Sequence, residues 1–475
     1  MNKLNLIKGF SILLLATVGF GNSQDTKAAE VSEKPSEITI TLHKKGFESL
    51  PADQANSGLV SDKFGEENIA GVDFEQFDVS AVYYDLLKDD PDTQDVDDGM
   101  TAAAAIAWMQ KKDYKDWNTI LNGVDPIDSH TTTDNGTAVF NNVQVSDDDG
   151  KDKVYLFLET YSPAHISKVA APMVVMMPVM MPNVVDGTWD GSSWKDTFNT
   201  DVHLYPKNEV READKKMNVP AGDELREVIL DKGDEGTETI SYLDLEKGKQ
   251  VSYTITAPIP YFIDSINCDS SAVIKNFVIT DTPTAGLSYF DQEIEVKVGE
   301  EELVKGTDYS VAQSDNGFAV TILTETNGVA NAETLAKLAE GRGGDLTITY
   351  NMLVTATIKA DEFHNNTATI LIGRNDAYDY DEEVIPDEKV ATGGRKFEKY
   401  DASSKQTLSG AQFEIWNGNK DKFAVFYKDG AELTTYEAGA DRIVWSDSGS
   451  GVAATKFTSD DQGKFEVQGL DYGTY

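Results

Sequence analysis

The chain has 475 residues, of which 82 are Asp or Glu and 41 are Lys or Arg, so its formal net charge is −41. This excess of negative charge disfavours binding to nucleic acid or to an anionic membrane surface, because both carry the same sign. A hydrophobic content of 40% is typical of a globular protein, and the single cysteine, Cys268, excludes internal disulfides and cysteine-rich metal sites.

The N-terminus resembles a secretory signal peptide. Two lysines precede an apolar stretch at residues 10–20, and small residues follow it. The alternative, a transmembrane anchor, needs about 20 apolar residues, roughly twice the length of this stretch. We therefore expect residues 1–29 to be a signal peptide and the mature protein to be secreted. The sequence leaves cleavage after Gly21 and cleavage after Ala29 both open.

After residue 35 apolar and polar residues alternate in short segments, which is the period of a half-buried strand. Gly, Asn and Asp clusters separate these segments, as in β-sandwiches. Helical periodicity is confined to residues 100–121 and 333–341, which we expect to be insertions. The predicted fold class is all-β, with tandem immunoglobulin-like β-sandwich domains and a helical insertion in the first. The clearest expected strands are residues 37–45, 137–145, 153–160, 250–257, 318–326, 345–353, 367–373, 411–416 and 464–470.

Changes in composition divide the chain into three expected domains, at residues 30–190, 191–392 and 393–475. The first and third share one order of segments: a lysine-bearing strand, a small-residue and glycine strand, a glycine and aromatic strand, and a tyrosine. The second lacks this order, so we expect a different type of sandwich there. The third domain is short, and we expect it to be the truncated beginning of a domain that continues beyond Tyr475.

Common enzyme motifs are absent from the sequence. There is no HExxH, P-loop, GxSxG, or GxGxxG after a strand. None of the five histidines pairs at the i, i+4 spacing, and the acidic segment 89–99 lacks the closing glutamate of an EF-hand loop. We therefore expect no metal and no cofactor. A secreted β-rich hydrolase is the enzymatic alternative, but no motif brings two acids together, so we expect the protein not to be an enzyme.

Lys207 stands in a distinctive place, directly after Tyr205 and Pro206 at the end of an expected strand. Proline removes a hydrogen-bond donor from the ladder and fixes φ, so the strand should end there and present the next side chain. From this pattern alone Lys207 is an ordinary surface lysine.

Three strings together resemble the backbone (major) pilins that sortases assemble in Gram-positive bacteria. They are YPK at 205–207, HNNTATI at 364–370, and FEKYD at 397–401 followed by LSGAQFEI. The resemblance covers nearly the whole chain after the signal peptide. It implies collagen-adhesin domains of the B type (CnaB-like) at both ends and of the A type (CnaA-like) in the middle. One departure is that Trp194 lies eight residues before Val202, so the part of the family motif upstream of YPK is stretched.

The resemblance implies a cell-surface pilus subunit attached to the cell wall. Its implied partners are other copies of the chain, a class C-type pilin sortase, ancillary pilins and host surface molecules. The amine of Lys207 would attack a sortase-bound thioacyl intermediate and form an intersubunit isopeptide bond. No LPXTG-type sorting signal occurs in the sequence, which agrees with the expected truncation. The alternative is an ancillary tip pilin or a matrix-binding adhesin built from the same domains. An acceptor lysine in YPK favours the backbone subunit, because a tip pilin needs none.

The family also forms Lys–Asn amide bonds within its domains, without an enzyme. In the middle domain the resemblance assigns Asn366 as the asparagine and Asp281 as the catalytic acid. The lysine is Lys215 or Lys216, and we favour Lys216. In the third domain Lys399 takes the lysine position, but its acid and asparagine partners would lie beyond the end of the sequence. We therefore expect that bond not to form and the third domain to be loose.

In the first domain, Glu159 lies in a segment similar to the family's E-box and is the candidate catalytic acid. The lysine is Lys44 or Lys45. The asparagine is unassigned by the resemblance, with Asn183 as one possibility. First domains of these pilins often lack such a bond, so the resemblance does not require one here.

Overall fold

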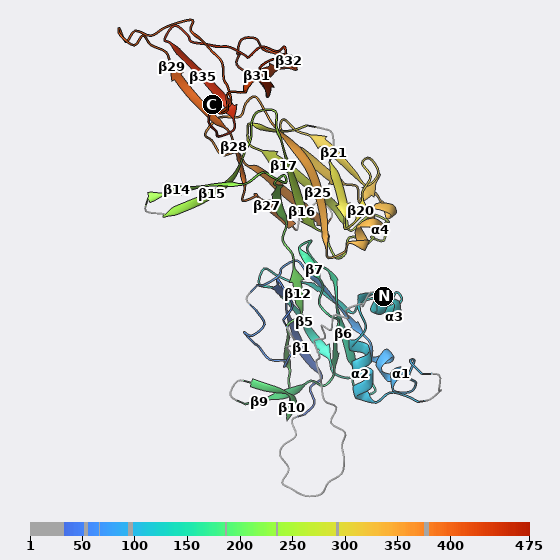
Figure 1. The fold of residues 1–475 in the computed structure, drawn as a ribbon. Helices are drawn as coiled ribbons and strands as arrows, with labels where there is room; N and C mark the ends of the chain where they lie inside the picture. The colour runs from blue at the N-terminus through green and yellow to red at the C-terminus, as the bar shows by residue number, and fades with distance from the viewer. Residues whose placement is uncertain are drawn as a thin grey trace. The chain divides into compact units, whose positions relative to one another are not determined.

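The computed structural model describes residues 33–51, 56–65, 67–93, 98–185, 188–233, 236–290, 294–374 and 380–475. The chain divides into two compact units (Figure 1). Unit 1 comprises Met1–Arg211 with Pro260–Phe262, and unit 2 comprises Glu212–Ile259 with Ile263–Tyr475. The expected boundary at residue 190 falls inside unit 1, whose main segment continues to Arg211. The predicted signal peptide, residues 1–29, lies outside the described residues.

The described part of unit 1 is built from strands with three helices inserted among them. Its sheets have the orders β11-β1-β5, β4-β3-β6-β8 and β2-β12-β7, and β9 pairs with β10. The elements are β1 (Glu37–His43), β2 (Lys45–Phe47), β3 (Asp73–Asp78), α1 (Ser80–Leu86), α2 (Ala102–Gln110), α3 (Tyr114–Leu121), β4 (Asp128–Thr131), β5 (Thr137–Gln144), β6 (Val154–Tyr161), β7 (Ile166–Lys168), β8 (Met173–Met176), β9 (Met180–Val185), β10 (Thr188–Phe198), β11 (Asp201–Leu204) and β12 (Lys207–Val210).

Strand β6 is the centre of unit 1 because both of its faces are buried. Tyr155 and Phe157 point into a core shared with β1, β5 and β11, and Leu156 and Leu158 point into a second core against the helices. Alternation along a strand sends successive side chains to opposite faces, which explains why β6 is apolar along nearly its whole length. The helical insertion therefore covers the outer face of this sheet (Figure 1).

The helical segment expected at residues 100–121 is two helices in the structure. The break falls at Asp113, whose side chain accepts a hydrogen bond from the backbone of Asp116 while the Asp116 side chain accepts one from the backbone of Asp113. This capping box starts α3 and separates it from α2. Helix α1 was not predicted from the sequence. The second expected helix, at 333–341, is α4 (Ala332–Glu340) in unit 2.

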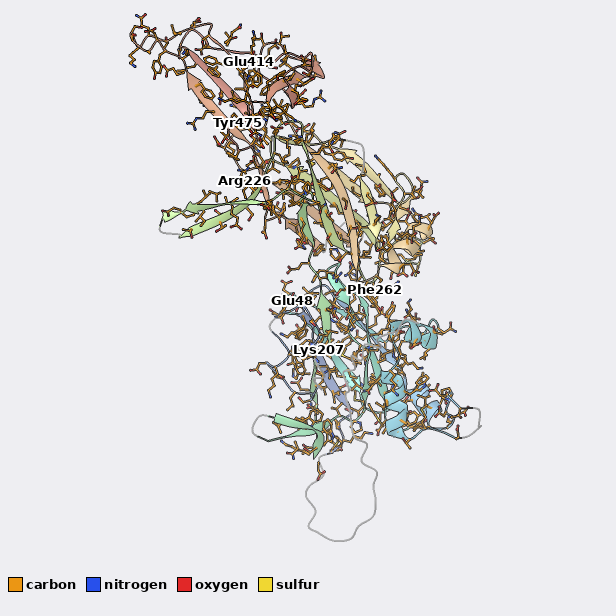
Figure 2. The ribbon with its side chains drawn as sticks, in the orientation of Figure 1. Glu48, Lys207, Arg226, Phe262, Glu414 and Tyr475 are labelled. Atoms are coloured by element: carbon orange, nitrogen blue, oxygen red, sulfur yellow. The ribbon has the colours of Figure 1, made fainter. Side chains whose placement is uncertain are left out.

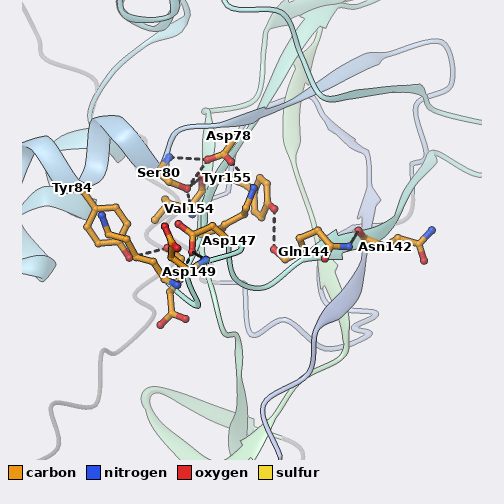
Figure 3. A network of polar contacts seen from close by, with 12 residues as sticks. Asp78, Ser80, Tyr84, Asn142, Gln144, Asp147, Asp149, Val154 and Tyr155 are labelled. Atoms are coloured by element: carbon orange, nitrogen blue, oxygen red, sulfur yellow. Dashed lines mark hydrogen bonds and ion pairs between the residues drawn. The ribbon is translucent and has the colours of Figure 1, made fainter.

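A polar network fixes the start of β6 against neighbouring segments (Figure 3). The Tyr155 hydroxyl donates to the carbonyl of Gln144 at 2.8 Å. The backbone of Val154 donates to the Ser80 hydroxyl at 2.9 Å, and the Ser80 backbone donates to Asp78 at 3.0 Å. These bonds tie the start of β6, the strand that carries Glu159, to β5 and to the start of α1.

Unit 2 contains a β-sandwich followed by a smaller set of sheets. The two large sheets have the orders β13-β16-β25-β19-β20, with β18 also on β25, and β21-β22-β17-β26-β27. Phe318 of β22 contacts Tyr350 of β25 edge-to-face at 4.7 Å, so the two sheets face each other. The strands are β13 (Asp214–Asn218), β14 (Arg226–Asp231), β15 (Thr237–Asp244), β16 (Gln250–Pro258), β17 (Ile274–Pro283), β18 (Leu287–Tyr289), β19 (Glu295–Val298), β20 (Glu301–Glu302), β21 (Tyr309–Gln313), β22 (Phe318–Ile322), β23 (Glu325–Thr326), β24 (Val329–Ala330), β25 (Asp345–Val354), β26 (Asn366–Arg374), β27 (Tyr380–Val384) and β28 (Lys389–Ala391).

The C-terminal part of unit 2 has its own buried cluster, which includes Phe426, Ile443 and Phe457. Its sheets are β29-β35, β30-β34 and β32-β31-β33. The predicted all-β class with a helical insertion in the first domain is confirmed. The remaining strands are β29 (Gly393–Glu398), β30 (Gln412–Phe413), β31 (Lys422–Lys428), β32 (Ala431–Glu432), β33 (Arg442–Asp447), β34 (Phe457–Thr458) and β35 (Lys464–Leu470).

Candidate functional site

Alternation along two strands of unit 1 brings a lysine and a glutamate to the same buried layer. In β1 the residues Ile38, Ile40 and Leu42 face the core, and Lys44 continues that face one residue after the strand ends. In β6 the side chain of Glu159 follows Phe157 on the same face. Both charged side chains are buried, with exposed fractions of 0% and 1%.

Asn208 of β12 completes this cluster. Lys44 Nζ lies 2.7 Å from Glu159 Oε2 and donates to the side-chain oxygen of Asn208. Asn208 Nδ2 donates to Glu159 Oε1 at 2.9 Å, and the backbone of Ala170 donates to Glu159 Oε2 at 2.9 Å. The carboxyl therefore contacts the amine and the amide directly. Asn208 is fully buried, and its strand β12 is an inner strand that pairs with β2 in parallel and with β7 on its other side.

Burial changes the chemistry of the Lys44 amine. Removing a charged group from water disfavours the charged form, and this lowers the pKa of Lys44 to about 8 although Glu159 favours the ammonium. At neutral pH a lysine with such a pKa is an uncharged amine about a tenth of the time, far more often than an exposed lysine. The cluster thus holds a nucleophilic amine beside an amide carbon and an acid.

Lys207, the candidate acceptor, directly precedes Asn208 on β12, and Figure 2 labels it. Its side chain is largely buried, at 9% exposure, and its amine lies 4.6 Å from the centre of the Phe64 ring. Phe64 stacks on Tyr205 at 4.4 Å, and the Tyr205 hydroxyl accepts a hydrogen bond from the backbone of Ser61 at 2.7 Å. The tyrosine of YPK therefore holds the loop that places an aromatic face against the lysine.

A second cluster lies between the two large sheets of unit 2. Lys215 Nζ is 2.5 Å from Asp281 Oδ2, and the Tyr350 hydroxyl donates to the same oxygen. Asn366 Nδ2 donates to the Tyr350 hydroxyl at 3.0 Å. Of the cluster's oxygens, Asp281 Oδ1 and Asn366 Oδ1 are buried and meet no hydrogen-bond partner within the described part of the chain. All four side chains come from different strands: β13, β17, β25 and β26.

Electrostatics in this second cluster favour neutral groups. Burial lowers the pKa of Lys215 to about 8, against the opposing effect of Asp281. Burial also raises the pKa of the Asp281 carboxyl, although Lys215, Tyr350 and Asn366 all favour its ionised form. Both shifts favour the uncharged forms, a neutral amine and a protonated acid, and a neutral amine can attack a carbonyl carbon.

The structure distinguishes between the lysines that the sequence left open. Lys216, which we favoured, points away from the core with its side chain 73% exposed and pairs with Asp214 at 2.7 Å. Lys215 faces inward with Met217 because β13 alternates, so Lys215 replaces Lys216 in the cluster. In unit 1 it is Lys44 that is buried, whereas Lys45 bonds Asn68 at 2.8 Å near the surface.

Two other assignments lie apart from these clusters. Asn183 was the possible asparagine partner in the first domain, but it is exposed in the hairpin of β9 and β10. The asparagine that contacts Lys44 and Glu159 is Asn208 instead. Lys399 is exposed just after β29 ends. Sequence reasoning missed Asn208 and Tyr350. The sequence feature that could have pointed to Asn208 is its position next to Lys207. For Tyr350 the sequence offers only an inward-facing position in a strand.

The described residues contain neither a metal-binding group of three or more His, Cys, Asp or Glu side chains nor a helix long and apolar enough to cross a membrane. The acidic segment 89–99 lies partly outside the described residues. Cys268 is exposed.

Comparisons with known proteins agree with this architecture. The family model of the Gram-positive pilin subunit D1, N-terminal domain, matches residues 35–209, and that of the prealbumin-like fold domain (SpaA) matches residues 393–475. The chain is 27% identical over 290 residues to the fimbrial subunit type 2 of Actinomyces naeslundii, an alignment that covers 57% of this chain and 45% of that protein. The chain thus spans less than half the length of this relative.

Two solved structures are similar over most of the chain. The full-length major pilin SpaD from Corynebacterium diphtheriae is 21% identical, covers 94% of this chain and 83% of its own, and has a TM-score of 0.36. The RrgB pilus protein from Streptococcus pneumoniae is 15% identical, covers 92% and 89%, and has a TM-score of 0.46. Residues 35–209 thus match a Gram-positive pilin D1 domain, and residues 393–475 match a prealbumin-like domain.

Proposed function

We propose that this protein is the backbone subunit of a covalent cell-surface pilus, polymerised through Lys207 and stabilised by internal Lys–Asn bonds. The observation that carries the proposal is that Lys207 and Asn208 are consecutive on β12. One strand thus supplies both the acceptor amine and the asparagine of a buried Lys–acid–Asn cluster. A pulling force applied at Lys207 would reach the internal crosslink after a single residue, before it could peel β12 from β2.

The polymerising step joins two copies of the chain. The Lys207 amine attacks the thioacyl carbonyl that a pilin sortase holds on its cysteine, a C–N bond forms, and the C–S bond breaks to release the thiol. In unit 1 the amine rests on the Phe64 ring, an aromatic face that suits an ammonium ion. The reaction therefore needs the sortase to move the amine off this face and to accept its proton.

The internal step needs no enzyme. Lys44 Nζ attacks Cγ of Asn208, the new C–N bond replaces the bond to Nδ2, and ammonia leaves. Glu159 takes the amine proton and passes it to the departing nitrogen, since its two oxygens contact Nζ and Nδ2. In unit 2, Lys215 supplies the amine, Asn366 the amide and Asp281 the acid beside the amine.

An acceptor assay tests the proposed function. The purified chain is mixed with a pilin-type sortase and a peptide that carries an LPXTG-type signal, and the linkage is located by tandem mass spectrometry. We expect the peptide on Lys207 alone. Labelling spread over surface lysines, or labelling that omits Lys207, would contradict the assignment as a backbone subunit. The protein would then be better explained as an ancillary pilin or an adhesin.

A pair of adjacent substitutions tests the bond in unit 2. Lys215→Arg should prevent the bond, because arginine cannot supply a neutral amine. The intact mass of the variant should then exceed that of the wild type by the mass of the substitution plus that of the ammonia that is no longer lost. Lys216→Arg is the matched control and should leave the bond intact, since its side chain points to solvent. Mass spectra that reverse this order would assign the bond to Lys216.

A further inference from the structure

The second cluster differs from the first in how its acid reaches the amide. In unit 1 the Glu159 carboxyl contacts Asn208 Nδ2 at 2.9 Å with one oxygen and Lys44 Nζ at 2.7 Å with the other. In unit 2 the acid is an aspartate, one methylene shorter. There the Asn366 amide donates its hydrogen bond to the Tyr350 hydroxyl, and that hydroxyl donates to Asp281.

These contacts form an unbroken chain of hydrogen bonds from the attacking atom to the leaving atom. Lys215 Nζ contacts Asp281 Oδ2, the same oxygen contacts the Tyr350 hydroxyl, and the hydroxyl contacts Asn366 Nδ2. Every group in the chain is at most 2% exposed, so bulk water does not offer a competing path. We infer that Tyr350 is a catalytic residue of the unit 2 crosslinking reaction and relays a proton from Asp281 to the departing ammonia. This inference rests on the proposed Lys215–Asn366 bond.

The proton count closes without any further reactant. The step starts from the neutral amine and the protonated acid. Nζ bonds to Cγ of Asn366, and as the Cγ–Nδ2 bond breaks, the proton at Oδ2 passes to the Tyr350 oxygen while the phenolic proton passes to Nδ2, which leaves as ammonia. Nζ then gives one proton to the vacated Oδ2. The carboxyl and the phenol end as they began.

The environment of Tyr350 suits a neutral relay. Burial, with the nearby Asp281 as a second cause, raises the pKa of the Tyr350 phenol, so that it keeps its proton at neutral pH. The ring is held from two sides, by Phe318 at 4.7 Å edge-to-face and by Tyr253 stacked at 6.1 Å. The hydroxyl therefore has a fixed position between the acid and the amide.

Tyr350→Phe is the direct test, because phenylalanine keeps the ring and removes only the hydroxyl. The full chain is made by cell-free synthesis, sampled over time and digested, and the Lys215–Asn366 crosslinked peptide is quantified by mass spectrometry. We expect crosslinking in unit 2 to slow by about 100-fold, the usual loss when a general acid is removed. The Lys44–Asn208 crosslink in the same molecule should form at its normal rate, which supplies an internal control.

Tyr253→Phe is the matched control. Tyr253 stacks on Tyr350, and its buried hydroxyl contacts no hydrogen-bond partner within the described residues, so its loss should leave the rate unchanged. In an Asn366→Ala background, where no bond can form, adding Tyr350→Phe removes only the hydrogen bond to Asp281, so the melting temperature should fall by no more than the loss of one buried hydrogen bond explains. Failure of that double variant to fold would assign the hydroxyl a structural role instead.

The outcomes separate the relay from the bond on which it rests. If wild-type protein crosslinks and Tyr350→Phe crosslinks as fast as Tyr253→Phe, the relay is wrong and the bond stands. If the mass of the wild-type protein shows no loss of ammonia in unit 2, the Lys215–Asn366 bond does not form, and the proposed relay is wrong as well.

Discussion

Under the proposed function, replacing Lys207 by arginine should abolish covalent polymerisation of this protein in cells that carry a pilin sortase. Arginine keeps the positive charge and can lie on the Phe64 ring as lysine does, so the local packing is preserved. It cannot lose its proton in a protein, however, and so has no nucleophilic amine. We expect the ladder of high-molecular-weight species on denaturing gels to collapse to the monomer, while secretion of the monomer continues.

Lys45→Arg is the matched control for this experiment. Lys45 lies opposite Lys207 in the parallel register of β2 and β12, but its amine bonds Asn68 near the surface. Its replacement should leave the ladder unchanged. A ladder that persists in Lys207→Arg would refute Lys207 as the acceptor, and a ladder lost in Lys45→Arg would move the acceptor to the neighbouring strand.

Replacing Asn208 by alanine should remove the crosslink of unit 1 and lower its stability strongly. Lys44 and Asn208 are 164 residues apart in sequence, so their bond would close almost the whole unit into a loop. The chain-entropy estimate for a crosslink of this length is about 5 kcal/mol of unfolding free energy. Lys44 would keep its contact with Glu159 at 2.7 Å, so the variant should still fold, with one ammonia retained in its mass.

Asn183→Ala is the control, because Asn183 was the asparagine that the sequence suggested and its side chain is exposed. It should change neither the crosslink nor the free energy of unfolding measured by denaturant. Glu159→Gln provides a second route to the same state, since it keeps the shape of the acid but cannot shuttle the proton. Equal stabilities of Asn208→Ala and wild type would mean that no crosslink forms in unit 1.

In the two clusters, strand alternation predicts which lysines are buried but not which residues of other strands they contact. Inward-facing Leu42 and Met217 indicate that Lys44 and Lys215 are the buried lysines, because side chains two residues apart share a face. The same rule contradicts Lys216, which we favoured from family context alone. Alternation does not say which buried residue of a distant strand lies opposite, and so it could not select Asn208 over Asn183.

The sequence by itself determined the all-β class, because a period of two in short segments is a local feature. Lys207 in YPK and the acids Glu159 and Asp281 became candidates only through the resemblance to a family, since periodicity alone does not single them out. Only the tertiary structure decided which amine, acid and amide meet. The pairing of β12 with β2 brings Asn208 to Lys44, and the facing sheets of unit 2 bring Tyr350 between Asp281 and Asn366. Such contacts join residues far apart in the chain, and packing of whole sheets, rather than any local pattern, sets their distances.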